Sequence, residues 1–296
     1  MAAVLFFPCL LAADERLDRV LSRLAEATEA FLRVAPLALS EETLVQKTWR
    51  APSLLRPQPG APRGQSGKPG LQTREIVSEY GFSTFADSPN VLHEIRQVIS
   101  VDGRQVRNRE SARLTLSLGA SSRDVRVKRR MLRELETYGL TSAAIDLGQM
   151  ILLFAPPHAG DYEFQLAGHG EIPPDKALIF NFLQTRGASS VTVFEGRNAR
   201  RESIQGELWV RESDSLPLRV LIRTGRAQGR HRLRDEAAVD YAMSPYGALL
   251  PSTVVHREYL DDRLEVERLF RYAPFRKFSA ETHIKFDEAP PEQTPP

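Results

Sequence analysis

The second half of the sequence alternates apolar and polar residues, and this pattern constrains the fold more than any other feature. From about residue 146 to residue 286 the alternating runs are short, and signals such as Pro156-Pro157 and Gly187 separate them. A period of two is that of a half-buried β-strand. No run between these strands has the length of a crossover helix, which parallel neighbours would need. The pattern predicts an antiparallel sheet of consecutive hairpins.

The clearest hairpin joins residues 204–210 to residues 216–222 through the turn at 212–215. Its apolar residues predict one buried face, and its charged residues predict a polar opposite face. The charged set is Glu207, Arg211, Arg219 and Arg223.

Trp209 is out of phase with Leu208 and Val210 in this hairpin. The phase predicts that Trp209 lies on the outer face, packed under a helix or a partner. With the reversed phase, Trp209 would point into the interior and contact a ligand.

The first half of the chain combines the two-residue period of strands with the period of helices. Residues 74–85 and 91–101 predict strands, and Asp102-Gly103 predicts a tight turn after the second of them. Helical periodicity follows over residues 109–118 and again up to Tyr138, with Gly139 in the position of a C-cap. Over the whole chain, the pattern predicts roughly nine to eleven strands.

Residues 1–13 carry no charge, and a charged stretch begins at Asp14. The apolar length is that of a signal-peptide core and too short to span a bilayer as a helix. Residues 1–13 therefore predict a signal peptide and export to the periplasm, with the basic start supplied by an upstream initiation site. The alternative is a buried terminal strand or helix. Residues 14–34 have apolar positions at three- and four-residue steps, which predicts an amphipathic helix ending near Pro36.

Residues 51–70 are rich in proline and glycine and predict a mobile loop. The end of the chain, residues 289–296, predicts a disordered tail. Between signal peptide and tail, residues 14–288 predict one domain. A long meander curls around its apolar face, so the expected fold is α+β and mainly β: a strongly curved antiparallel sheet, or half-barrel, with helices covering its concave face.

Composition and motifs argue against several functions. The 40 Lys and Arg balance 38 Asp and Glu, which disfavours nucleic-acid binding. The densest basic cluster, residues 123–133, predicts a solvated helical face; its residues are Arg123, Arg126, Lys128, Arg129, Arg130 and Arg133.

No catalytic or cofactor-binding signature is present, so we predict no catalytic residue, no cofactor and no metal. Only His256 and Glu258 place two metal-capable groups on one strand face. Two ligands do not complete a metal site, so an exposed structural pair is predicted there. Asp261-Asp262 is expected to form a hairpin turn.

The later hairpins resemble those of the periplasmic lipoprotein-carrier superfamily of the LolA and LolB type. The residues concerned are Gly206-Glu207-Leu208-Trp209-Val210, Leu216-Pro217-Leu218-Arg219-Val220, Val239-Asp240-Tyr241, Leu250-Pro251 and Arg271-Tyr272. Upstream, residues 74–80 and 101–106 resemble uncharacterised exported bacterial proteins whose C-terminal half has the same pattern. The order of helix, strands, helices and further strands is also similar.

The resemblance implies a non-enzymatic carrier that holds a hydrophobic ligand, such as a lipid or the acyl chains of a lipoprotein, in a curved-sheet cavity. The expected cavity lining is Leu208, Val210, Leu218, Val220, Ile222, Val239, Tyr241, Leu264, Val266 and Phe270. The alternative is an envelope protein-protein interaction module in which the same residues fill a closed core. A carrier needs a cavity of several hundred Å³, whereas an interaction module packs to the density of a protein interior.

Overall fold

The structure is a computed structural model that describes residues 8–50, 70–86, 88–122, 124–140, 146–187, 191–195, 198–202 and 204–277. The predicted loop, except Gly70, and the whole predicted tail lie outside these residues. The first seven residues of the predicted signal peptide lie outside them as well.

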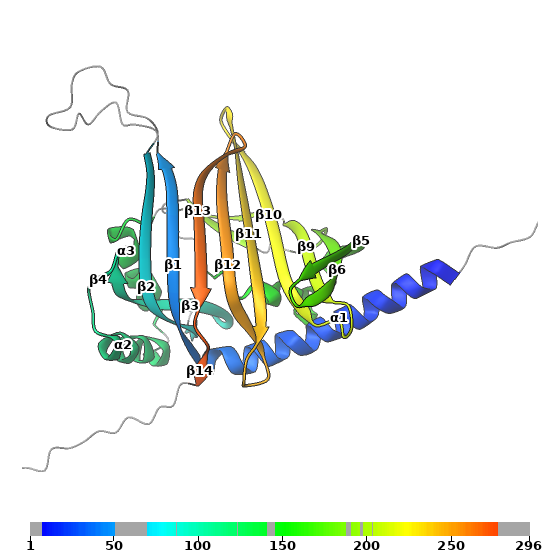
Figure 1. The fold of residues 1–296 in the computed structure, drawn as a ribbon, viewed down its shortest axis with the longest axis horizontal. Coiled ribbons are helices and arrows are strands. Elements are labelled where there is room, and N and C mark those ends of the chain that lie inside the picture. Colours follow the sequence, from blue (N-terminus) through cyan, green and yellow to red (C-terminus); the bar gives the residue numbers. More distant parts are fainter. Residues whose placement is uncertain are drawn as a thin grey trace, which may run out of the picture.

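Twelve strands form one open antiparallel sheet in the order β4-β3-β2-β1-β13-β12-β11-β10-β9-β6-β5, with β14 paired to β1 (Figure 1). A separate hairpin joins β7 to β8, so the described residues hold more strands than the nine to eleven expected. The strands are β1 (Ala38–Arg50), β2 (Gly70–Phe85), β3 (Ser88–Val101), β4 (Arg104–Gln105), β5 (Tyr162–Ile172), β6 (Asp175–Gln184), β7 (Val191–Glu195), β8 (Asn198–Glu202), β9 (Gln205–Arg211), β10 (Pro217–Gln228), β11 (His231–Met243), β12 (Leu249–Leu260), β13 (Arg263–Tyr272) and β14 (Arg276–Lys277).

The helices are α1 (Pro8–Val34), α2 (Arg109–Ser122), α3 (Val125–Thr137) and the short α4 (Pro156–Ala159), with 3-10 turns η1 (Ala35–Leu37) and η2 (Met150–Phe154). Helix α1 starts six residues before the predicted helix, and Pro36 lies in η1 just after its end. No helix within the described residues is both long and apolar enough to cross a membrane.

The sheet curls, so that β3 passes behind β1 and β13 in Figure 1. On β2, Phe82 packs edge-on against Phe31 of α1, with ring centroids 5.4 Å apart. The next residue, Ser83, donates its hydroxyl to the Ala120 carbonyl of α2 at 3.0 Å. Neighbouring strand residues face opposite sides, so α1 lies on the concave face and α2 on the outer face. The predicted half-barrel is confirmed, although α2 packs on its outside.

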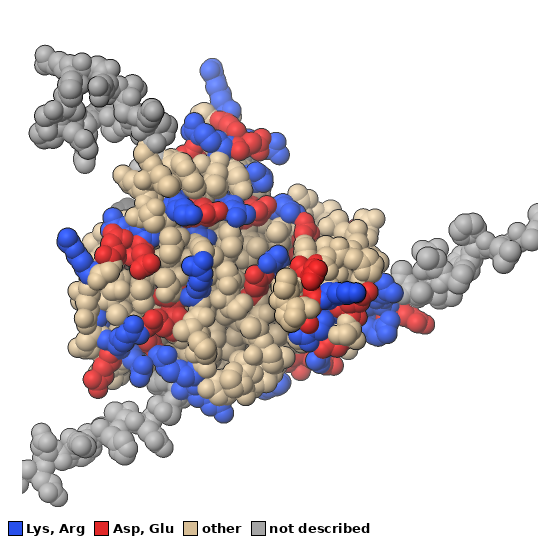
Figure 2. All heavy atoms as spheres, in the orientation of Figure 1, with Lys and Arg blue, Asp and Glu red and all other residues tan. Residues whose placement is uncertain are grey.

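The outer face carries a ladder of alternating charges across six strands. Each member lies directly opposite the next or within ion-pair distance: Glu207–Arg223 at 2.8 Å, Arg223–Glu236 at 3.2 Å, Arg257–Glu236 at 3.7 Å, Arg257–Glu267 at 2.9 Å and Lys47–Glu267 at 3.6 Å. Figure 2 shows this face, where blue and red side chains alternate in a band. The ladder marks the outer face as solvated and leaves the apolar residues to the concave face.

The turn predictions are confirmed. Asp102 and Gly103 have φ values of 49° and 75°, and they join β3 to β4. Asp261 and Asp262, at 50° and 62°, join β12 to β13. Two successive residues with positive φ are the signature of a type I′ hairpin turn. Gly139, with φ 86°, ends α3 as predicted.

Candidate functional site

The predicted cavity residues lie on the concave face of four strands of the sheet, β9, β10, β11 and β13. Nine of the ten are at most 6% exposed, and Leu264 is half-buried. Seven belong to one continuous apolar cluster: Leu208, Val210, Val220, Ile222, Val239, Tyr241 and Phe270. The strand phase that places them together also places Trp209 outside, as predicted. There Trp209 donates to Glu207 at 3.0 Å and lies 5.5 Å from the Arg219 guanidinium, measured at its ring centroid.

Two segments of the chain itself pack against this apolar surface. Helix α1 contributes Val20, Leu24 and Phe31, which are fully buried. The second segment, residues 146–154, includes η2, and we call it the plug. Its Ile151 is 0% exposed and its Phe154 1% exposed. Within the described residues, therefore, this part of the concave face is covered by helical turns that are not part of the sheet.

Hydrogen bonds tie the plug to the strands, and Asp146 at its start accepts from the Glu94 amide at 2.7 Å. The Gly148 amide donates to Glu94 Oε1 at 2.5 Å, and the Ile151 amide donates to Tyr241 Oη at 2.8 Å. The Gln149 side chain donates to the Leu92 carbonyl at 2.7 Å. Each of these hydrogen bonds involves a side chain and none belongs to a strand ladder, so the plug is attached to the sheet without being part of it.

Aromatic rings surround the end of the plug. The Phe154 ring lies 5.2 Å from the ring of Tyr162, 5.6 Å from that of Phe164 and 5.0 Å from that of Phe182, between centroids. The pairs with Tyr162 and Phe182 are edge-to-face, which is a favoured geometry. This aromatic pocket is the apolar anchor of the plug.

A buried charge network lies beneath the plug. Arg96 binds Glu42 through Nε at 2.7 Å and through Nη2 at 2.8 Å, and its Nη2 also binds Glu94 at 2.7 Å. The exposed fraction is 5% for Arg96, 1% for Glu42 and 0% for Glu94. Burial raises the pKa of Glu94, and the charge of Arg96 opposes that rise. Sequence reasoning missed this network because Glu42 lies 54 positions from Arg96 and the residues carry no motif.

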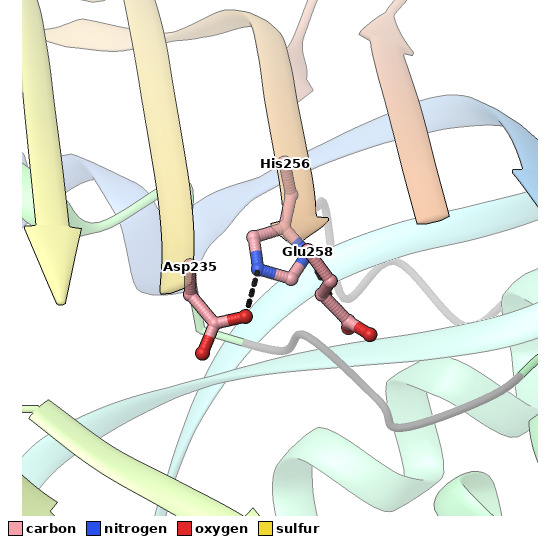
Figure 3. Close-up of side chains that lie close together, drawn as sticks. All are labelled: Asp235, His256 and Glu258. Carbon is pink, nitrogen blue, oxygen red and sulfur yellow. Dashed lines mark ion pairs between the residues drawn. The ribbon is translucent and has the colours of Figure 1, made fainter. Parts of the chain in front are cut away.

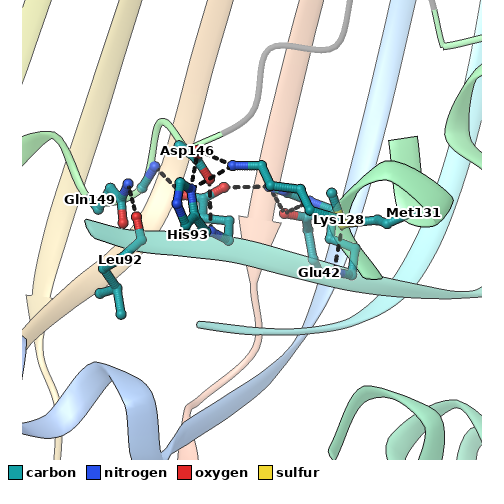
Figure 4. A network of polar contacts seen from close by, with 10 residues as sticks. Glu42, Leu92, His93, Lys128, Met131, Asp146 and Gln149 are labelled. Carbon is teal, nitrogen blue, oxygen red and sulfur yellow. Dashed lines mark hydrogen bonds and ion pairs between the residues drawn. The ribbon is translucent and has the colours of Figure 1, made fainter. Parts of the chain in front are cut away.

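The start of the plug is held by a second polar group (Figure 4). Asp146 lies between His93, whose Nδ1 is 3.2 Å away, and Lys128, with which it forms an ion pair. Burial alone would raise the pKa of Asp146, but hydrogen bonds from His93 and Lys128 and the lysine charge lower it. The predicted solvated basic face is therefore confirmed for the exposed Arg126, Arg130 and Arg133 but wrong for Lys128, which is 9% exposed.

Further along the strands the concave face becomes polar around Arg268, which is 0% exposed. Arg268 donates to Gln46 at 3.1 Å, to His256 Nδ1 at 3.0 Å and to Glu258 at 2.5 Å. The prediction of an exposed His256–Glu258 pair is wrong for His256, which is 7% exposed because Arg268 and neighbouring strands enclose it.

Asp235 completes a group of three metal-capable side chains with His256 and Glu258, with ligand atoms within 4.8 Å of one another (Figure 3). Arg268 can only donate, so His256 Nδ1 accepts and the proton of the neutral ring is on Nε2. That nitrogen faces Asp235 at 4.0 Å. A protonated nitrogen has no lone pair for a metal, so the geometry fits a hydrogen-bonding network and not a metal centre.

Acid is expected to destabilise the protein through His256. Burial and then the Arg268 charge lower the pKa of His256 from 6.5 to about 3. The unfolded chain takes up a proton near the ordinary pKa and the folded chain does not, so stability present above that pKa is lost as the pH falls towards about 3. Between pH 6.5 and 4.5 the free energy of unfolding should fall by about 2–3 kcal/mol from this group.

Urea unfolding at both pH values tests this prediction in His256→Gln, whose amide oxygen still accepts from Arg268. The variant should lose that much less stability on acidification than the unchanged protein. His169→Gln, at a side chain that is 65% exposed, is the control. An equal acid-induced loss in His256→Gln and the unchanged protein would contradict the assignment.

The fold defines the chain as an open antiparallel half-barrel with helical segments on its concave face. No protein-family model matches the chain, and no curated protein matches it.

Solved structures give likenesses of fold. A DUF1329 family protein from Desulfovibrio piger is similar over 88% of this chain and 92% of its own, with 10% identity and a TM-score of 0.37. A LolA superfamily protein from Nitrosomonas europaea is similar over 87% and 93%, with 11% identity and a TM-score of 0.30. The lipoprotein LppX of Mycobacterium tuberculosis is similar over 86% and 93%, with 11% identity and a TM-score of 0.25. The superfamily that the hairpins resemble is thus among those that the structure comparison finds.

Proposed function

We propose that this protein is a non-enzymatic binding protein that holds the apolar chain of a lipid or lipoprotein against the concave face of its sheet. The plug is the observation that carries the proposal. It fills the apolar surface with Met150, Ile151 and Phe154, yet it is joined to the strands by hydrogen bonds that involve side chains and not by a strand ladder. A ligand that displaces the plug makes the same apolar contacts.

The size of the displaced segment supports this function. Three large side chains leave a space of roughly 300 Å³, the lower end of the range for small-molecule pockets. A hollow of about 640 Å³ at the β10–β11 turn adjoins the polar end of the concave face, with Thr224 and Ile204 in its wall. Thr224 is the cross-strand neighbour of Asp235. We call the space that the plug fills on the concave face the chamber. The proposed ligand reaches the chamber from this polar end.

Export is part of the same proposal. Among the residues of α1 whose side chains are described, those packed on the core run from Leu17 to Val34. Cleavage after Ala13 therefore keeps this packing surface. A mature domain of residues 14–288 in the periplasm agrees with the carrier superfamily that the hairpins resemble.

A filled concave face also favours a second function, the envelope interaction module that binds a protein partner and no lipid. The two functions differ in whether the plug moves. In the module the plug is a permanent part of the core.

Native mass spectrometry with lipid extraction distinguishes the two functions. The protein from the envelope fraction should carry an acyl lipid that denaturation releases. Tyr241→Phe removes the acceptor of the Ile151 amide and should raise the uptake of added monoacylglycerol severalfold, because the plug is held less firmly. Tyr259→Phe, at a half-buried tyrosine beneath Arg234, is the matched control. A folded protein without extractable lipid and without uptake in either variant would exclude the carrier.

A further inference from the structure

We propose that Glu94, Tyr80 and Arg96 form the headgroup subsite of the chamber, and that it selects an uncharged headgroup with both a hydroxyl or amide donor and a carbonyl acceptor, such as a monoacylglycerol. This inference rests on the proposed function, because the plug covers the subsite until a ligand replaces it.

Glu94 creates the requirement for a hydrogen-bond donor on the ligand. Its Oε2 accepts from Arg96 Nη2 at 2.7 Å, and its Oε1 accepts from the Gly148 amide at 2.5 Å. When the plug leaves, Oε1 loses its donor inside a site that water does not reach freely. A buried acceptor without a partner is costly, so a ligand that supplies a hydroxyl or amide hydrogen is favoured.

Two buried donors of the protein create the requirement for a hydrogen-bond acceptor on the ligand. Within the described part of the chain, Tyr80 Oη and Arg96 Nη1 have no hydrogen-bond partner. Tyr80 is 0% exposed and Arg96 is 5% exposed. The two residues are opposite each other on β2 and β3, and the guanidinium carbon lies 5.0 Å from the centroid of the tyrosine ring. Unpaired buried donors are rare in proteins, and a ligand oxygen satisfies both.

Gly148 marks the place of the headgroup. A Cβ on this glycine would lie 2.7 Å from Glu94 Oε1 and 2.9 Å from Tyr80 Oη. The backbone of the plug therefore approaches the acceptor and one of the unpaired donors so closely that a larger residue would have to push these side chains aside. A small polar headgroup that takes its position touches both groups.

The charges of the site argue against an anionic headgroup. Arg96 is already bound to two carboxylates, Glu42 and Glu94. A carboxylate or phosphate would add a further negative charge to a buried site with one positive group. Burial first and then the charge of Glu94 raise the pKa of Tyr80, which agrees with a site that disfavours added negative charge.

Three probes with one acyl chain test the subsite by isothermal titration calorimetry of the full chain. 1-Monopalmitoylglycerol has a donor and an acceptor, methyl palmitate has only the acceptor, and palmitate is an anion. We expect the dissociation constant of the monoacylglycerol to be about tenfold lower than that of methyl palmitate. Palmitate should bind more weakly than the monoacylglycerol at pH 7.5.

Tyr80→Phe removes one donor to the carbonyl that both neutral probes carry, so it should weaken the binding of the monoacylglycerol and of methyl palmitate alike, by about threefold to tenfold, and leave the preference between them unchanged. The hydroxyl has no partner among the described residues, so the variant should stay folded, and thermal unfolding checks this. Tyr259→Phe should keep the full affinity for both probes. Equal affinity for the three probes, or tightest binding of palmitate, overturns the subsite and leaves the proposed function standing. Failure of every probe to bind overturns the proposed function itself.

Discussion

Arg96→Met should lower the free energy of unfolding by about 3–5 kcal/mol, one of the two largest effects that we expect. The change leaves Glu42, at 1% exposed, and Glu94, at 0% exposed, without their shared positive partner. Two buried carboxylates then face each other in a medium that solvates neither. Equilibrium unfolding in urea measures the loss.

Arg130→Met is the matched control, because Arg130 is exposed on α3 and surface substitutions usually change stability by less than about 0.5 kcal/mol. Adding Glu42→Gln to Arg96→Met should recover part of the loss, since one uncompensated charge is removed. A loss below about 1 kcal/mol in Arg96→Met would show that the network is hydrated and not buried as described.

Phe154→Ala is expected to cost about 3–5 kcal/mol of stability, because it empties the aromatic pocket formed by Tyr162, Phe164 and Phe182. The same change removes the anchor of the plug. Monopalmitoylglycerol at a hundred times its dissociation constant for Phe154→Ala should therefore stabilise that variant by about 2–3 kcal/mol and the unchanged protein by less.

Urea unfolding with and without the lipid measures both effects. Leu118→Ala, at an exposed position on α2, is the control and should change neither stability nor lipid response. A destabilised Phe154→Ala protein with no added response to the lipid would mean that the pocket is core and not part of a ligand chamber.

The hairpins could be predicted from the sequence because their inner residues are apolar and their outer residues are charged. Residues 204–210 and 216–222 pair antiparallel as β9 and β10, with the expected face buried. Strand β1 was not predicted, and its composition explains why. Its buried face carries Ser40, Glu42, Gln46 and Thr48, so the usual alternation is reversed for most of its length.

The apolar lining could also be predicted, since strand phase alone places its members on one face. Their contact with a ligand stays a prediction. The charged groups could not be predicted because cross-strand pairing brings them together from distant positions. Arg268 and Gln46, for example, are 222 positions apart and are direct neighbours on β13 and β1. The plug is an apolar run like many core segments, and only its place on the concave face sets it apart.

Photo-crosslinking tests the central claim most directly. The full chain is incubated with a monoacylglycerol that carries a diazirine in its acyl chain, illuminated and digested, and the labelled peptides are identified by mass spectrometry. We predict labels on inner residues such as Val220, Ile222 and Val239 or within the plug, and their loss in excess monopalmitoylglycerol. Labels confined to the charge ladder of the outer face, or labels that excess lipid does not remove, would contradict the account.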